Sequence, residues 1–316
     1  MAQSNEPVSV VFFGTGIFAS VILEHLLNSE YFKIVLVATQ PSRPVGRKQI
    51  KQGYPVKNVC DEKKIKVLQP ADLDSIDELT KKQDLNIIVD YGIKIPNSII
   101  DLPKFGSINI HPSLLPKYRG PSPLQTAILN GDSETGISIM LIDEKMDHGP
   151  ILAQTKIRIS DNDNYSMLNN KVAIKAANFL PKVIKQYIAG VIKPVEQMHD
   201  YAIFCKLFNR ESGKIDFNDN ADRIFNQYRA TIPWPGLWSL IDGKRIIFKE
   251  IKKSDKNILQ GKMIFTENKI FIGCSSGSIE IIKIQLAGGK EMMSKEFING
   301  YLRYNNYDFL NKQANS

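Results

Sequence analysis

The residues of this sequence with the clearest chemical potential lie at Asn109, His111 and Asp147. Asn109 and His111 alternate with apolar residues, and strand side chains repeat with a period of two, so the amide and the imidazole should share one face. Chemistry on a carbonyl needs such a pair: a hydrogen-bond donor where negative charge develops, and a group that moves a proton. Asp147 supplies a carboxylate and is the expected third member of the site.

The Asn-x-His pair has an ordinary alternative explanation, because two polar residues can simply cap a loop. In this chain the pair ends an expected central strand and is followed by the loop 112–116, which begins and ends with proline. Proline restricts its own backbone and that of the preceding residue, so this loop should hold a ligand at a lower entropic cost. The pattern therefore favours a binding loop at the end of the strand.

Short β-branched runs alternate with helical stretches over the first two-thirds of the chain. This alternation predicts an α/β fold with a mostly parallel, Rossmann-like sheet and helices on both faces. The expected strands cover residues 8–13, 33–38, 66–69, 86–91, 107–111, 136–142 and 151–159. The expected helices cover residues 18–29, 76–83, 124–130 and 165–188.

The pattern changes after a linker near residues 192–202, where a helix is expected over 222–229. The strands expected after that helix cover residues 246–251, 262–265, 269–272 and 278–285. Their spacing predicts a small antiparallel, OB-like β-barrel of a kind that often binds oligonucleotides. We therefore expect two domains, 1–204 and 205–316, and we expect Trp234 and Trp238 to be buried.

Length and composition limit the class of protein. With 316 residues, of which 43% are hydrophobic and 23% charged, the chain fits a globular protein of two domains. No apolar run approaches the ~20 residues of a membrane span, and the N-terminus lacks the composition of a targeting peptide, so we expect a cytoplasmic protein without a membrane segment. Cys60, Cys205 and Cys274 lack paired spacing and a clustered histidine, so we expect neither a disulfide scaffold nor a metal site.

Positive charge is unevenly distributed along the chain. The net charge is +8, and from Cys205 to the end there are 18 lysines and arginines against 12 acidic residues, which favours an anionic partner. A second basic run contains Arg43, Arg47 and Lys48. It follows the second expected strand, at the carboxyl edge that should carry the site, where it can bind a phosphate backbone. The alternative is a solvated charged loop.

The turn Gly14-Thr15-Gly16 follows the first expected strand and opens a helix, as in a dinucleotide-binding fingerprint. Ala19 replaces the third glycine, and Thr39-Gln40 replaces the acidic residue expected about 20 residues further on. A tight strand-to-helix turn explains the glycines better. The turn can still line a site, because ligands in open α/β sheets bind at the carboxyl ends of the strands.

Two longer segments carry a family resemblance. HPSLLPKYRG at 111–120, with TGISIMLIDEKMDHGPIL at 135–152, resembles the folate-dependent formyltransferase superfamily, which moves a formyl group from 10-formyltetrahydrofolate to an amine. The resemblance implies that Asn109, His111 and Asp147 are catalytic. It also implies a set of folate contacts, at Ser113, Leu114, Leu115 and Pro116.

Within the superfamily the chain most resembles the enzymes that formylate the α-amino group of methionine on initiator methionyl-tRNA for translation initiation. Residues 40–48 are similar to the loop that contacts the tRNA acceptor arm in that family, and residues 284–292 are similar to its closing motif. Lys206 falls at the start of the family's C-terminal tRNA-binding domain. The resemblance therefore implies that Arg43, Arg47, Lys48 and Lys206 contact tRNA, and it implies a monomer.

Several positions depart from the family pattern or remain open. Asp90 stands where a small residue is commoner, and His148 follows the expected catalytic aspartate. Arg119 is expected either to help bind RNA or to pair with a surface carboxylate, and His199 is expected to have no partner.

Two other functions compete with this interpretation. A formyltransferase acting on a small amine, such as an amino sugar nucleotide or glycinamide ribonucleotide, would explain the three catalytic residue types equally well. A non-catalytic RNA-binding protein with the same fold would explain the basic charge. Salt separates tRNA from a small substrate, because binding through many phosphates weakens steeply with ionic strength.

Overall fold

The computed structural model describes residues 6–42, 44–45, 50–51, 53–70, 73, 83–241 and 243–302. The chain divides into two compact units. The first contains the described residues up to 123 together with 134–158 and 168–205, and the second contains 124–133, 159–167 and the described residues from 206 onward.

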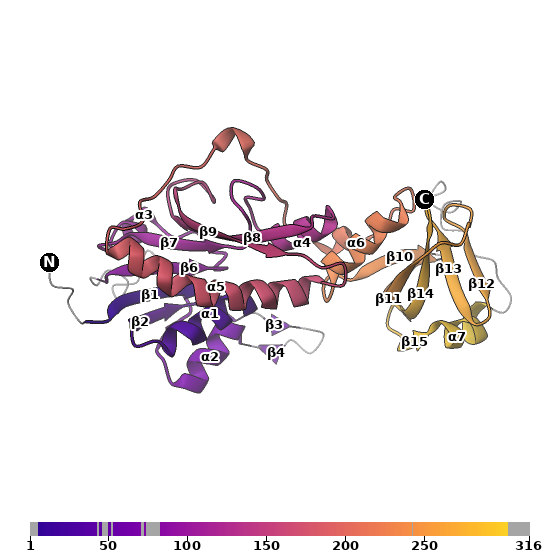
Figure 1. Cartoon of the computed structure of the whole chain (residues 1–316). Coiled ribbons are helices and arrows are strands. Elements are labelled where there is room, and N and C mark those ends of the chain that lie inside the picture. Colours follow the sequence, from indigo (N-terminus) through magenta and orange to yellow (C-terminus); the bar gives the residue numbers. More distant parts are fainter. Residues whose placement is uncertain are drawn as a thin grey trace. The chain divides into compact units, whose positions relative to one another are not determined.

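A seven-stranded sheet organises the first unit, in the order β5-β2-β1-β6-β7-β8-β9 (Figure 1). The strands are β1 (Val8–Gly14), β2 (Phe32–Ala38), β5 (Val67–Leu68), β6 (Leu85–Val89), β7 (Ser107–His111), β8 (Glu134–Leu141) and β9 (Ile151–Arg158). The five strands from β5 to β7 pair in parallel, and β8 and β9 add two antiparallel pairings at one edge. The expectation of a mostly parallel sheet is therefore confirmed. A separate small sheet joins β3 (Pro44–Val45) and β4 (Ile50–Lys51).

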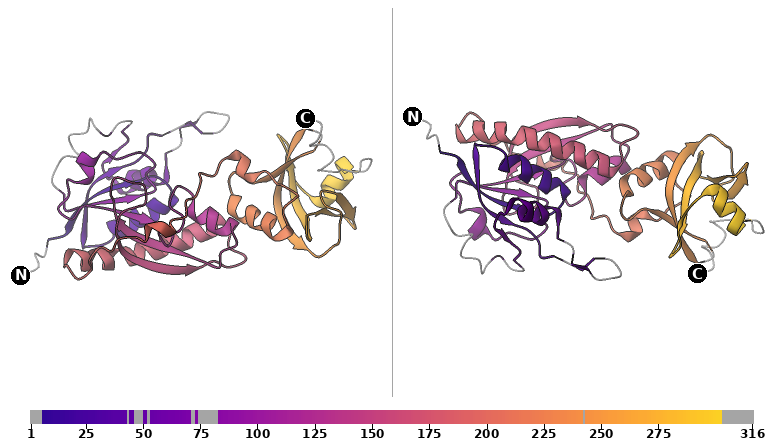
Figure 2. Two further views of the ribbon diagram at one scale, coloured as in Figure 1. Left: turned by 90° about the horizontal axis from the view of Figure 1, so that it is seen from above. Right: turned by 90° about the horizontal axis from the view of Figure 1, so that it is seen from below.

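Helices cover both faces of this sheet. Because strand side chains alternate, Val11 and Phe13 of β1 point to one face and Phe12 to the other. Val11 and Phe13 share a core with Ile99 of α3 (Asn97–Ile100). Phe12 and Ala19 of α1 (Ile17–Leu27) both lie where a Cβ at Gly14 would be, so this helix packs closely on the strand. The long α5 (Tyr165–Ile188) lies beside α1 (Figures 1 and 2).

The strands of the seven-stranded sheet and the long helix were predictable from periodicity, and two shorter helices were not. α2 (Pro55–Lys63) begins with proline in its first turn, and Lys64, the residue that caps its end, adopts a left-handed conformation. Its low apolar content gives little helical periodicity, so sequence reasoning missed it, as it missed the four-residue α3. The expected helix 76–83 lies, except for Gln83, outside the described residues.

The second unit has an antiparallel sheet in the order β10-β11-β14-β13-β12, with β15 paired to β14. Its strands are β10 (Leu237–Ile241), β11 (Lys244–Ser254), β12 (Met263–Thr266), β13 (Lys269–Gly273), β14 (Ser278–Leu286) and β15 (Glu291–Met293). Its helical segments are α4 (Pro123–Leu129), η3 (Arg210–Gly213), α6 (Ala221–Thr231), α7 (Ser294–Phe297) and η4 (Ile298–Leu302). All of α4 except Pro123 belongs to this unit. The antiparallel C-terminal sheet is thus confirmed.

One apolar core fills the second unit. The long strand β11 changes register against β14 near Phe248 and Glu250, so it can follow a curved sheet. Ile224 of α6 and Phe297 of α7 are buried in the same core as Phe248. Trp238 is buried as expected, at 6% exposure, but Trp234 is 57% exposed, so the expectation that both tryptophans are buried was wrong for Trp234.

None of the helices in the part of the chain that the structure describes is long and apolar enough to cross a membrane.

A buried amide ties together the elements that support β7. Asn86 in β6 is fully buried, and its Nδ2 donates to the backbone oxygen of Ile99 at 2.9 Å and to Ser107 Oγ at 3.0 Å. Gln83 Nε2 donates to Asn86 Oδ1 at 2.9 Å. The amide therefore bonds to α3, to the first residue of β7 and to the segment before β6.

Replacing Asn86 by leucine should strongly destabilise the first unit. The substitution leaves the Ile99 oxygen and Gln83 Nε2 without this partner, whereas Ser107 Oγ still donates to the Ile100 oxygen at 2.7 Å. Each unsatisfied buried group costs about 1–3 kcal/mol, so we expect the free energy of unfolding, measured by urea titration, to fall by about 2 kcal/mol or more. Asn178→Leu is the matched control, because Asn178 is an exposed amide on α5, and it should change stability by less than about 0.5 kcal/mol. Equal effects of the two substitutions would contradict this assignment.

Candidate active site

β7 places Asn109 and His111 on one face of the sheet, two residues apart. His111 is the last residue of the strand and Asn109 pairs with Ile88 in β6 and with Met140 in β8. The two side chains therefore lie at the carboxyl end of a strand that has a neighbouring strand on each side in the sheet. This is the arrangement that the sequence predicted for the amide and the imidazole.

Asp147 reaches this strand through a hairpin loop. β8 pairs antiparallel with β7 and β9 pairs antiparallel with β8, so the intervening segment 142–150 must turn back. The backbone N–H of Leu141 donates to the oxygen of Pro150 at 2.9 Å, which closes the base of the loop. A Cβ at Gly149 would collide with the Leu141 oxygen, so the loop fits tightly at this point. The loop thus brings Asp147 to β7.

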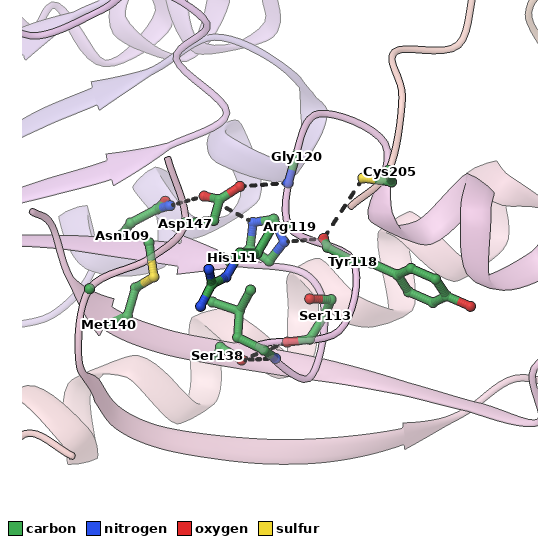
Figure 3. A network of polar contacts seen from close by, with 12 residues as sticks. Asn109, His111, Ser113, Tyr118, Arg119, Gly120, Ser138, Met140, Asp147 and Cys205 are labelled. Atoms are coloured by element: carbon green, nitrogen blue, oxygen red, sulfur yellow. Dashed lines mark hydrogen bonds and ion pairs between the residues drawn. The ribbon is translucent and has the colours of Figure 1, made fainter. Parts of the chain in front are cut away.

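The three predicted catalytic side chains converge on one oxygen (Figure 3). Asn109 Nδ2 donates to Asp147 Oδ1 at 3.3 Å, and His111 Nδ1 lies 3.5 Å from the same oxygen. The other carboxylate oxygen, Asp147 Oδ2, accepts the backbone N–H of Gly120 at 2.7 Å. The amide, imidazole and carboxylate that are far apart in the sequence are therefore in contact.

The loop after β7 supports both His111 and Asp147 through its backbone. His111 Nε2 lies 2.9 Å from the oxygen of Tyr118, so this nitrogen carries a hydrogen and donates. The thiol of Cys205 is directed at the same oxygen, at 3.7 Å. Gly120, which holds Asp147, has a φ of 117°, and an added Cβ would collide with the oxygen of Cys205. Only glycine fits this position.

Left-handed backbone conformations cluster around the site. Tyr118 has a φ of 61° and Asp147 a φ of 51°, and neither residue is glycine. Such conformations are uncommon for residues with a side chain, and they persist where the surroundings impose them, often at functional sites. The two loops that carry the site are therefore fixed by their contacts.

The site is largely closed to water. The side chains of His111 and Asp147 are only 6% and 10% exposed, so the ion-pair geometry lies in a region where electrostatic interactions are strengthened. His111 presents one nitrogen to the Tyr118 oxygen and the other to Asp147, so a doubly protonated ring would donate to an acceptor on each side. Asn109 Nδ2 has a second N–H beyond the one directed at Asp147. Together these groups can donate to a developing oxyanion and accept a proton.

The four predicted folate contacts form a rigid loop beside the site. They are Ser113, Leu114, Leu115 and Pro116. Ser138 of β8 fixes the loop: its hydroxyl donates to the Ser113 oxygen at 2.7 Å and accepts the Leu115 N–H at 3.0 Å. Ser113 and Leu115 are buried, whereas Leu114 and Pro116 are partly exposed. The loop therefore offers a partly apolar surface, and its polar groups are mostly engaged within the chain.

Asp90 lies at the same edge of the sheet. It follows β6 directly, two residues after Ile88, which pairs with Asn109. Asp90 is an exposed residue, but one carboxyl oxygen lies against the start of α1, where a Cβ at Gly16 would collide with Asp90 Oδ2. Desolvation raises the pKa of the Asp90 carboxyl to about 6, and the N–H of Gly16 acts in the opposite direction. This carboxyl therefore titrates far above its usual range.

The predicted tRNA contacts are only partly described. Arg43, Arg47 and Lys48 lie outside the described residues. Lys206 is exposed at the start of the last segment of the second unit.

Sequence reasoning missed the residues that support the site. Arg119 neither lies free on the surface nor pairs with a surface carboxylate: its side chain is only 4% exposed and donates to Gln197. His199 has partners, since it stacks on His148 and bonds to Arg119. Gly120 contributes a backbone N–H, which no side-chain pattern reveals.

Among the residues that the structure describes, no group of three or more histidine, cysteine or acidic side chains is arranged to hold a metal ion.

Family models match both units. The model described as "Formyl transferase" matches residues 8–184, and the model described as "Formyl transferase, C-terminal domain" matches residues 208–302. The first match alone covers more than half of the chain, and it includes all three residues of the converging site.

Curated relatives resemble the chain over nearly its whole length. A protein named "Methionyl-tRNA formyltransferase" from Thermodesulfovibrio yellowstonii is 37% identical, over 92% of this chain and 95% of that protein. One of the same name from Hydrogenobaculum sp. is 38% identical, over 93% of this chain and 97% of that protein. Among solved structures, the sugar 3N-formyl transferase WlaRD, determined in the presence of dTDP and 5-N-formyl-THF, has a TM-score of 0.64 at 22% identity and covers 90% of this chain and 99% of its own. That likeness shows the shared fold.

The raised pKa of Asp90 makes the stability of the chain depend on pH in a specific direction. At a pH below the ordinary pKa of 3.8 the carboxyl is protonated in the folded and unfolded chains alike, so it does not change the free energy of unfolding. As the pH rises toward about 6 the unfolded chain ionises first, and the folded state loses stability by an amount that is complete above that pH. Asp90→Asn removes this loss.

The Asp90→Asn variant should therefore gain stability relative to the unmodified chain as the pH rises. We expect the difference in Tm, variant minus unmodified, to be larger at about pH 7.5 than at about pH 4, as thermal unfolding would measure. A difference that is the same at both pH values, or that shrinks on raising the pH, would contradict the desolvated environment of Asp90.

Proposed function

Since the chain belongs to the methionyl-tRNA formyltransferase family, we propose that it transfers the formyl group of 10-formyltetrahydrofolate to the α-amino group of methionine on initiator methionyl-tRNA. The observation that carries this proposal is the convergence of Asn109, His111 and Asp147 on one desolvated carboxylate oxygen. Formylation of this tRNA serves translation initiation, so the proposed activity belongs in the cytoplasm.

Each of the three residues has a distinct proposed role. When the amine attacks the formyl carbon, negative charge develops on the formyl oxygen, and a preorganised donor there lowers the barrier. Asn109 donates its second N–H to that oxygen, and protonated His111, whose two ring nitrogens face Tyr118 and Asp147, stabilises it by its positive charge. Asp147 orients His111 and accepts the proton of the attacking amine, directly or through one water. It returns this proton to the folate nitrogen as the bond between that nitrogen and the formyl carbon breaks, so the amine keeps the formyl group and the folate leaves as a secondary amine. Gly120 keeps the second oxygen of Asp147 in place throughout.

The proposed folate site is the edge of the sheet beside this triad. When bound, the folate supplies a formyl group on a tertiary nitrogen. Leu114 and Pro116 offer a partly apolar surface on a loop that Ser138 makes rigid, and such a surface suits a flat heteroaromatic ring. Asp90, at the end of the adjacent strand, offers an acceptor to ring N–H groups. The described residues therefore fit a pterin.

We assign the two predicted domains different tasks. Residues 1–204 would catalyse transfer, and residues 205–316 would bind tRNA, where basic residues outnumber acidic ones. Arg43, Arg47, Lys48 and Lys206 would contact the phosphate backbone, so binding should weaken steeply with salt. The protein would act as a monomer.

An amino sugar nucleotide is the second candidate acceptor. The observation in its favour is the fold shared with a sugar 3N-formyl transferase. At 22% identity that likeness carries less weight than relatives of 37–38% identity, all named for methionyl-tRNA, that extend over more than nine-tenths of this chain. Transfer of labelled formyl groups to charged initiator tRNA, compared with amino sugar nucleotides, distinguishes the two.

Removing any member of the triad should lower turnover without loss of tRNA binding. Loss of one oxyanion donor lowers kcat by about 10²–10³-fold, so Asn109→Ala should do so in a formylation assay with charged initiator tRNA. His111→Ala and Asp147→Asn should do the same or more. The Kd for tRNA should stay within about twofold, because none of the three is proposed to touch a phosphate.

Charge removal in the basic loop should give the opposite pattern. Arg43→Ala should raise KM for tRNA and flatten the dependence of log Kd on log salt by about one phosphate, while kcat at saturating tRNA changes little. If Arg43→Ala lowered kcat and Asn109→Ala weakened tRNA binding instead, the proposed roles would be interchanged.

A further inference from the structure

A residue that is distant from the triad in the sequence forms hydrogen bonds with the backbone of the loop that carries Asp147. Gln197 is 5% exposed, and its Nε2 donates to the backbone oxygen of Asp147 at 3.0 Å and to that of Gly149 at 2.8 Å. Both N–H groups of this amide therefore go to the same loop, on either side of His148. The side chain of Asp147 is held by Gly120, and its backbone is held by Gln197.

The other end of the Gln197 amide is fixed just as firmly. Gln197 Oε1 lies 3.2 Å from Arg119 Nε and 2.7 Å from Arg119 Nη2. A guanidinium group can only donate, so the atom facing it must be the amide oxygen, and the amide nitrogen must face the two carbonyls. No flipped orientation satisfies these contacts.

Arg119 occupies the centre of the supporting contacts. The residue before it, Tyr118, accepts from His111, and the residue after it, Gly120, donates to Asp147. Its side chain reaches Gln197. One residue is thus linked to the proposed acid–base pair by its backbone neighbours and to the backbone of Asp147 by its side chain.

The segment that contains Gln197 is anchored at both ends within the first unit. We call Val195–Cys205 the strap. At its start, Val195 exchanges two backbone hydrogen bonds with Ile151 of β9, and near its end the N–H of Cys205 donates to the Arg119 oxygen at 2.8 Å. Between these points it arches over the unit, with η2 (His199–Tyr201) at its apex (Figure 1).

A second contact links the strap to the same loop. Arg119 Nη2 lies 2.8 Å from His199 Nδ1, which must therefore accept. The ring of His199 stacks on that of His148, with centroids 3.9 Å apart and planes within 3°. His148 Nδ1 in turn lies 2.6 Å from Asp143 Oδ2 in the same loop. The strap thus contacts the backbone of Asp147 through Gln197 and the ring of His148 through His199.

We propose that Gln197 is a positioning residue, which couples Arg119 to the backbone of Asp147 and so fixes the carboxylate against Asn109 and His111. Asp147 has a left-handed φ in a loop without regular structure, so contacts of this kind must hold it. A misplacement of about 1 Å in a catalytic group can cost about 100-fold in rate. The inference rests on the proposed function of Asp147.

The substitution Gln197→Glu tests the coupling. It keeps an acceptor for Arg119 but replaces the two N–H groups by an oxygen, which repels the carbonyls of Asp147 and Gly149. We expect kcat for formylation of methionyl-tRNA to fall by about 10–100-fold, with KM for both substrates within about threefold. If Gln197 had only a structural role, the substitution would lower the Tm but would not lower kcat selectively relative to KM.

The matched control is Gln227→Glu. Gln227 Nε2 also donates to two backbone oxygens, those of Ser212 at 2.9 Å and Lys214 at 2.8 Å, but in the second unit. This variant should lose a similar amount of Tm, and its kcat should stay unchanged. If Gln197→Glu does not accumulate as folded protein, Gln197→Met and Arg119→Lys carry the test, with the same expected loss of kcat.

The result also separates this inference from the proposed function. If Asp147→Asn abolishes turnover while every folded variant of Gln197 and Arg119 keeps kcat within about twofold, the coupling is wrong and the proposed function stands. If Asp147→Asn itself turns over normally, the proposed role of Asp147 fails. A loss of kcat in Gln227→Glu equal to that in Gln197→Glu would also overturn the coupling, since the effect would then be general.

Discussion

The described site depends on the contacts that the two carboxylate oxygens of Asp147 make. One is held by the N–H of Gly120, and the other is shared by Asn109 and His111. A carboxylate that is almost removed from water is tolerated only when its oxygens are bonded, because an unpaired buried charge is very costly. The same bonds that make the charge tolerable also set the direction in which His111 and Asn109 present their N–H groups. Stability and chemistry therefore place the same demand on these loops.

The topology of the sheet explains why residues so distant in the sequence can meet. β7 is the last strand of the parallel series, and β8 and β9 add antiparallel pairs beside it. A parallel connection would need a crossover, but a hairpin can return within a few residues. The loop between β8 and β9 is such a return, and it reaches β7 without any further element. The change from parallel to antiparallel pairing is thus what allows a short segment to complete the site.

The sequence predicted the parts of the site that depend on side-chain type and period. Asn109 and His111 followed from alternation in a strand whose bounds were predicted as observed, and the antiparallel C-terminal sheet followed from short alternating runs. The supports of Asp147 were not predictable in this way. Gly120 contributes a backbone group that depends on its φ, and Gln197 stands in an irregular linker without periodicity. Asp90 was visible as a departure, but the pKa of its carboxyl is raised by desolvation in the folded chain, which no sequence pattern reveals.

The second unit is assembled from separate stretches of the chain. Arg223 on α6 donates to the Asn130 oxygen Oδ1 at 3.3 Å, and the buried Arg229 donates to the backbone oxygens of Ser160 and Asp163 at 3.1 Å and 3.0 Å. Residues 124–133 and 159–167 thus belong physically with the residues from 206 onward. A fragment made of only the last third of the chain would remove the acceptors at Asn130, Ser160 and Asp163, and would leave Arg229 with Asn226. The proposed RNA-binding residues 205–316 therefore depend on two segments from earlier in the chain, and we do not expect them to fold in the same way when they are produced alone.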